Sequence, residues 1–158
     1  MIKERGKKGI VIISLLLISA LLLFGSQRLW ARQVIIDDLQ ITEDEGCSEI
    51  LISFNFPVRY VKHFPYEFGD DLRIRIQPIV AGPEEQEALF TREPLIPPPN
   101  ELAGLTKLVY EGDVTDGPFI TLFFEDTVAF QVGQGGDFRS IVIMVTGPDT
   151  TEPCHINR

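Results

Sequence analysis

Aromatic and charged side chains are concentrated between residues 59 and 69, in the stretch Arg-Tyr-Val-Lys-His-Phe-Pro-Tyr-Glu-Phe-Gly. Aromatic rings beside charged groups can hold a sugar or a peptide strand, because the rings offer apolar contact area and the charged groups offer hydrogen bonds. The alternative is that these rings close one end of a hydrophobic core, since large apolar side chains are usually buried. The candidate binding residues are Arg59, Tyr60, Lys62, His63, Tyr66 and Phe68.

The residue types that carry catalysis are not arranged for it. His63 belongs to no Ser–His–Asp order, and no second metal ligand stands at a suitable spacing from it. The glycine-rich stretch 133–136 joins two candidate strands rather than opening a helix, so a tight turn with positive φ is expected instead of a phosphate loop. We therefore predict a protein with no enzymatic activity, no bound metal and no cofactor.

Two cysteines bracket the body of the chain, Cys47 near its start and Cys154 near its end. In an oxidising compartment such a pair predicts a disulfide. Two alternatives stay open from the residues alone. The cysteines could be free thiols, or they could join His63 and His155 in a metal site, although their spacing is not that of metal ligands.

Charge is distributed unevenly along the sequence. The 158 residues include 14 Lys and Arg against 23 Asp and Glu, for a formal charge of −9. Six of the basic residues and one acidic residue lie in residues 1–33, so residues 34–158 are strongly acidic. The length suits one domain with a short appendage. An acidic body repels phosphate backbones, which argues against nucleic-acid binding.

Residues 1–33 have the pattern of an export signal, with basic residues ahead of an apolar run from Ile10 to Phe24. As a helix the run would be about 22 Å long, short of the roughly 30 Å hydrocarbon core of a bilayer. Cleavage after Ala31 would release a soluble periplasmic domain. Retention would leave an inner-membrane anchor with Trp30 at the membrane interface. In both cases the charge bias places the C-terminal domain outside the cytoplasm.

Apolar and polar residues alternate with period two through much of the remaining sequence, which predicts β-strands. The candidates lie at 34–41, 49–56, 72–76, 107–114, 120–125 and 140–145. They fall into two similar halves, 34–77 and 105–146, because a shift of about 70 residues aligns their apolar positions. Each half is expected to be a strand–strand–loop–strand unit.

A Pro-rich connector, residues 78–104, separates the halves and is not expected to join the sheet, because proline lacks a backbone donor. One short helix is predicted at Pro83–Thr91, with proline in its first turn. The predicted fold is all-β: a small sandwich of two similar three-stranded units in residues 34–158, preceded by an N-terminal hydrophobic helix.

The first half, from Ser48 through Pro57-Val58-Arg59-Tyr60 to Ile76, resembles the AMIN domain. That family's pattern is a strand, a turn with an aromatic residue, and a strand that alternates aliphatic and polar residues. The resemblance implies two similar three-stranded β units and a place in the bacterial cell envelope, where such domains are thought to touch peptidoglycan. It transfers no functional residue, since the matched positions are mainly core positions.

The expected function is an exported, non-enzymatic binding or scaffold module of the bacterial envelope, contacting peptidoglycan or an envelope protein. The first alternative is a membrane-anchored subunit of a secretion or pilus-type complex that docks a partner through its β-domain. The second is an envelope enzyme, against which the missing acid–base and nucleophile arrangement argues.

Overall fold

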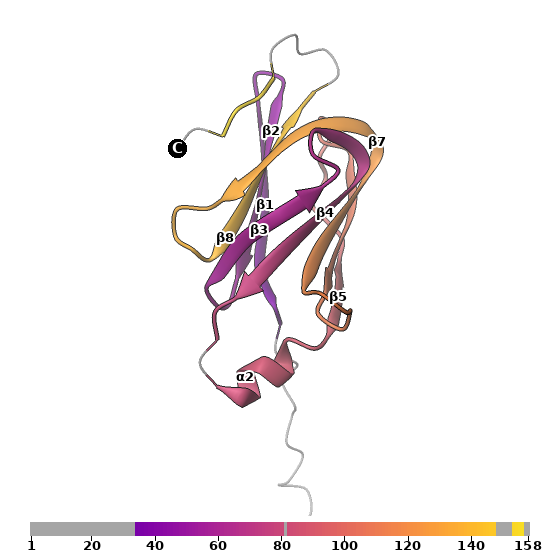
Figure 1. Cartoon of the computed structure of the whole chain (residues 1–158). Helices are drawn as coiled ribbons and strands as arrows, with labels where there is room; N and C mark the ends of the chain where they lie inside the picture. Colours follow the sequence, from indigo (N-terminus) through magenta and orange to yellow (C-terminus); the bar gives the residue numbers. More distant parts are fainter. Residues whose placement is uncertain (1–33, 81, 148–152, 157–158) are drawn as a thin grey trace, which may run out of the picture. The chain divides into compact units, whose positions relative to one another are not determined.

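The computed structural model describes residues 34–80, 82–147 and 153–156. In these residues eight antiparallel strands and one short helix follow one another along the chain (Figure 1). They are β1 (Ile36–Asp44), β2 (Cys47–Phe54), β3 (Val58–Phe64), β4 (Phe68–Pro78), α2 (Pro83–Ala88), β5 (Arg92–Leu95), β6 (Leu105–Glu111), β7 (Phe119–Gln134) and β8 (Ser140–Thr146). The all-β prediction is confirmed. The predicted signal or anchor, residues 1–33, lies outside the described residues.

Strand β7 connects the two arms of the sheet, because its two parts pair with different neighbours. Its first part, residues 119–124, lies between β4 and β6, and its last part, residues 129–134, pairs with β8. Beyond these pairs, β3 joins β4, β5 joins β6, and β2 links β8 to β1. The result is one continuous sheet that curves over at β7, so that both arms face a shared core (Figure 1).

The internal repeat extends to the pairing of the strands. Ile50 of β2 lies opposite Ile143 of β8, and Ile120 of β7 lies opposite Ile74 of β4. The first pair becomes the second when 70 is added to residue 50 and 69 is subtracted from residue 143. A register irregularity at Ile36–Asp38 of β1 recurs 69 residues later at Leu105–Lys107 of β6. The two halves therefore follow one pairing scheme.

The halves exchange strands rather than forming separate three-stranded sheets. One arm joins β3 and β4 of the first half to β6 and β7 of the second, and the other joins β8 and the end of β7 to β1 and β2. The first half also has a fourth strand, β3, where the sequence predicted a turn. Isolated hairpins cannot bury an apolar face, so each hairpin is completed by strands of the other half.

The connector differs from its prediction in two ways. Residues 92–95 form strand β5, which pairs with β6 and contains Pro94. A proline is compatible with this position because β5 pairs with one neighbour and lies at the edge of its arm. The predicted helix is present as α2, but it ends at Ala88 instead of Thr91.

The expected positive φ of the glycines at 133–136 is wrong. In the turn between β7 and β8 the left-handed residue is Phe138, with φ of 55°. Gly135 meets a different requirement, since a Cβ there would lie 1.8 Å from the Oγ of Ser140. A close backbone approach therefore accounts for glycine at this position.

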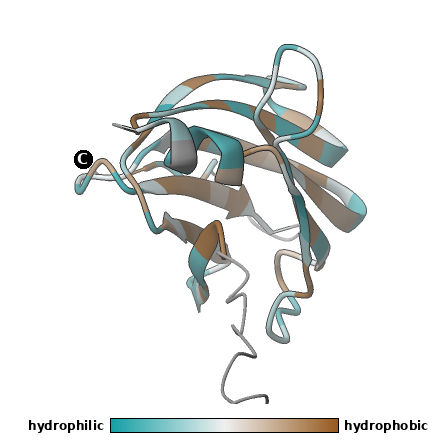
Figure 2. Ribbon diagram, turned by 90° about the horizontal axis from the view of Figure 1, so that it is seen from below, coloured by the Kyte–Doolittle hydropathy of each residue, from teal (hydrophilic) through white to brown (hydrophobic). Residues whose placement is uncertain are grey.

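The core consists of the inward-facing aliphatic residues of both arms. Buried and exposed positions alternate along β2, β4 and β8, as the period-two pattern predicts, and hydrophobic and hydrophilic bands alternate along the strands (Figure 2). Among the described residues there is no helix that is long and apolar enough to cross a membrane. Burial of the sheet's inner face is thus the main stabilising contribution.

Cys47 and Cys154 form a disulfide, which confirms the first of the three alternatives for the cysteines. Their Cα atoms are 5.8 Å apart, and Cys47 is the first residue of β2. The backbone N–H of Cys154 donates to the Oγ1 of Thr146 at 2.9 Å. The disulfide and this hydrogen bond hold the C-terminal segment, residues 153–156, against the ends of β2 and β8.

Reduction of the disulfide is expected to destabilise the fold by about 4–5 kcal/mol, because the crosslink restricts a long loop in the unfolded chain. The two cysteines are 107 residues apart. Urea unfolding with and without reductant measures the difference, and alkylation before and after reduction serves as the control. No thiol should react before reduction and two should react after it. Equal unfolding midpoints in the two conditions would contradict the prediction.

Candidate functional site

The turn between β3 and β4 carries aromatic rings that point into solvent. Phe64, Tyr66 and Phe68 are 70%, 71% and 64% exposed. The rings of Phe64 and Tyr66 meet edge to face, with centroids 6.2 Å apart. These three residues therefore do not close the core, whereas Tyr60 and His63 are half-buried. Exposed aromatic rings that gather in one place often mark a binding surface.

A register irregularity in β3 decides which side chains face this site. Between Tyr60 and Lys62 one extra residue interrupts the pairing with β4, and His63 then lies opposite the buried Ile74. Tyr60 and His63 consequently share the inward side of the strand. Arg59 and Lys62 lie on the outward side and are exposed. A bulge re-aims side chains in this manner at the edges of sheets.

His63 is held by hydrogen bonds at both of its ring nitrogens. Its Nδ1 is 2.6 Å from the hydroxyl of Tyr60, and its Nε2 is 3.0 Å from the carbonyl oxygen of Tyr66. The carbonyl can only accept, so Nε2 carries the proton and the Tyr60 hydroxyl donates to Nδ1. Burial raises the pKa of Tyr60, and the neighbouring Tyr66 raises it further, which keeps the donor protonated.

A groove of about 560 Å³ lies next to this network. One wall is the β3–β4 turn with His63, Tyr66 and Phe68, and the floor is the last part of β7. The opposite wall is the C-terminal segment, including Cys154 and His155. The Nδ1 of His155 lies 2.9 Å from the Nε2 of Gln131. Because the disulfide fixes this wall, the width of the groove depends on Cys154.

The predicted binding residues thus separate into two sets. Tyr60, His63, Tyr66 and Phe68 gather at the groove, while Arg59 and Lys62 are on the other face of β3. Sequence reasoning missed the contribution of Phe130 and of the C-terminal segment. The signals for both were present, since Phe130 is the repeat equivalent of Tyr60 and the predicted disulfide brings Cys154 to the sheet.

Chemically, the groove combines aromatic faces with carbonyl, amide and imidazole groups, a set suited to a peptide strand or a sugar ring. Within the described residues no three His, Cys, Asp or Glu side chains stand close enough together to hold a metal ion. Comparison of the chain with protein-family models, with curated proteins and with solved structures gives no match. The geometry of the chain itself must therefore support any functional assignment.

The exposure of Tyr66 and the hydrogen bond of Tyr60 predict different effects on stability. Tyr66→Ala is expected to change the free energy of unfolding by less than about 0.5 kcal/mol, because it removes exposed contacts. Tyr60→Phe is expected to cost about 0.5–1.5 kcal/mol, because His63 loses its donor. Denaturant unfolding of the two variants measures both values. A loss well above about 2 kcal/mol in Tyr66→Ala would show that its ring supports the core.

Proposed function

We propose that this chain is an exported, non-enzymatic binding module of the bacterial cell envelope. The observation that carries the proposal is the cluster of exposed rings, Phe64, Tyr66 and Phe68, beside a groove of about 560 Å³. Apolar groups exposed at these fractions lose contact with water when a partner covers them, which favours association. The partner is a peptide strand of an envelope protein or a peptidoglycan chain.

Binding explains the groove better than catalysis does. The half-buried His63 has both ring nitrogens engaged, one by the Tyr60 hydroxyl and one by the Tyr66 carbonyl. A general base must reach the proton that it removes, and an imidazole used in this way has no nitrogen directed at a substrate. Its role is then to hold the β3–β4 turn, and with it the exposed rings, in one conformation.

Three features support export to the periplasm. The basic and apolar residues of segment 1–33 have the order of an export signal. The Cys47–Cys154 disulfide is typical of an oxidising compartment. The resemblance of the first half to the AMIN domain, together with the repeat in the strand pairing, also favours an envelope protein built from two similar β units. We place the domain 34–158 outside the cytoplasm.

A second candidate function is a membrane-anchored subunit of a secretion or pilus-type complex, whose β-domain docks a partner protein. The exported domain and its groove would serve both functions. What favours the second is Trp30, between Arg28 and Arg32, which is typical of a retained helix end.

Binding is tested with the full chain in mild detergent and with two alanine variants. Wild type is expected to sediment with purified peptidoglycan, and Tyr66→Ala to reduce the bound fraction at least fivefold. Phe138→Ala is the matched control, because Phe138 is 66% exposed in the equivalent turn of the second half and lies outside the groove. It should bind as wild type does.

If peptidoglycan fails to retain the wild type, a photocrosslinking residue at position 66 distinguishes a protein partner. Irradiation in the envelope of the native host should give a discrete adduct from position 66 and none from position 138. Equal labelling from the two positions, with no binding to peptidoglycan, would contradict the proposed site.

Processing separates the two candidate functions. Intact mass spectrometry of the protein from the native envelope, without reductant, is expected to show a chain that begins at Arg32 and carries the disulfide. A mass that includes residue 1 or 2 would instead support the anchored subunit. Detection of two free thiols would contradict export to an oxidising compartment.

A further inference from the structure

Most of the positive charge of the domain lies on one surface. Six of the eight Lys and Arg residues between 34 and 158 are on the outer side of the arm formed by β3, β4, β7, β6 and β5. The register places them there, because the alternate residues of these strands are buried in the core. We call this surface the basic face, and it consists of Arg59, Lys62, Arg73, Arg75, Arg92 and Lys107.

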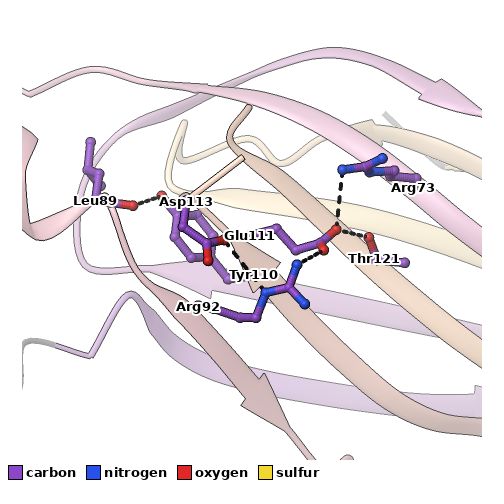
Figure 3. A network of polar contacts seen from close by, with 7 residues as sticks. All are labelled: Arg73, Leu89, Arg92, Tyr110, Glu111, Asp113 and Thr121. Carbon is purple, nitrogen blue, oxygen red and sulfur yellow. Dashed lines mark hydrogen bonds and ion pairs between the residues drawn. The ribbon is translucent and has the colours of Figure 1, made fainter. Parts of the chain in front are cut away.

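One part of the basic face is neutralised by a buried carboxylate (Figure 3). The side chain of Glu111 is 14% exposed and accepts a hydrogen bond from the Oγ1 of Thr121 at 2.7 Å. It also pairs with Arg73 at 3.5 Å and with Arg92, whose Nε is 3.6 Å from Asp113. These contacts fix two guanidinium groups and leave little charge to attract a ligand.

The other part of the basic face is not neutralised. Lys62 of β3 lies directly opposite Arg75 of β4, so their side chains extend from the same side of the sheet. Among the described residues no carboxylate lies within 4 Å of the charged groups of Arg59, Lys62 or Arg75. Like charges placed opposite each other across two strands destabilise a sheet.

The repeat shows that the fold does not require these charges. The equivalents of Lys62 and Arg75 in the second half are Gln131 and Met144, which also lie opposite each other. The same pairing scheme is therefore stable with a neutral pair at this position. A destabilising pair of cations that the fold does not need points to an anion supplied from outside.

The surroundings determine which anion fits. Residues 34–158 contain 22 acidic residues, most of them away from the basic face, and charges act over about 8 Å at physiological ionic strength. A long polyanion would extend onto this acidic surface and be repelled, whereas a short anionic segment would not. Guanidinium groups also match carboxylates, with which they form paired hydrogen bonds.

We propose that the basic face docks a short, extended, acidic segment of a partner protein. Arg73 and Arg75 are two residues apart on β4, a separation of about 6.6 Å. Alternate residues of an extended peptide have the same spacing, so carboxylates at alternate positions can meet both arginines, with Lys62 beside them. The exposed ring of Phe64, opposite Arg73, offers apolar contact at the rim. This surface is on the other side of β3 from the groove and does not depend on it.

The test uses the full chain in mild detergent and a fluorescent peptide that alternates Glu with Val and Thr. Fluorescence anisotropy at low salt is expected to show saturable binding that weakens as salt rises. A peptide with Gln in place of Glu should bind at least tenfold more weakly. Lys62→Glu should reduce affinity for the Glu peptide at least tenfold.

The same substitution provides an independent readout of folding. Lys62→Glu puts opposite charges across from each other, so its unfolding midpoint should equal or exceed that of wild type. Weaker binding in a protein of unchanged or higher stability cannot come from misfolding. A fall in the midpoint would overturn the inference that Lys62 and Arg75 repel each other.

Two control variants separate this surface from the rest of the molecule. Arg139→Glu makes the same change of charge at an exposed arginine outside the basic face, and Tyr66→Ala alters the groove. Both should bind the Glu peptide within about twofold of wild type. An equal loss in Arg139→Glu would reduce the effect to net charge. Tighter binding of heparin than of the peptide, lost in Lys62→Glu, would replace the acidic segment with a polyanion.

Discussion

The curvature of β7 is the constraint on which the structure depends. Its residues 119–124 complete one arm and its residues 129–134 complete the other, so the two apolar faces are brought together by one strand. Each arm on its own would expose the aliphatic side chains that now form the core, since a single open sheet cannot bury its own face. The irregularity between Phe123 and Val128 of β7, in its pairing with β4, marks where the sheet turns.

That same strand supports both proposed surfaces. Ala129 to Val132 form the floor of the groove, while Phe119 and Thr121 lie under the basic face, where the ring of Phe119 is 4.0 Å from the guanidinium carbon of Arg73. The disulfide adds the second wall of the groove by holding Cys154 at the edge of β2. The surfaces are therefore placed by the rigid sheet rather than by mobile loops, which reduces the ordering cost of binding.

Local patterns predicted the elements, and long-range pairing decided what the sequence could not convey. The alternation of Ile50, Ile52 and Phe54 indicates a strand with one buried face, and the repeat indicates its counterpart at Ile120. Strand β3 was missed because one extra residue near Val61 breaks the alternation from Tyr60 to His63. The basic face was missed for another reason: its six residues come from four strands that are adjacent only in the folded sheet.

Comparison of the two halves separates the requirements of folding from those of binding. Tyr60 and His63 correspond to Phe130 and Val132, which fill the same positions opposite β8 with apolar groups. Lys62 and Arg75 correspond to Gln131 and Met144. One pairing scheme thus accepts apolar or neutral residues at each of these positions, so folding does not account for the hydroxyl, the imidazole or the paired cations. All of these polar groups are on β3 and β4, and a β3–β4 hairpin that contacts partners on both of its faces would explain why they are concentrated there.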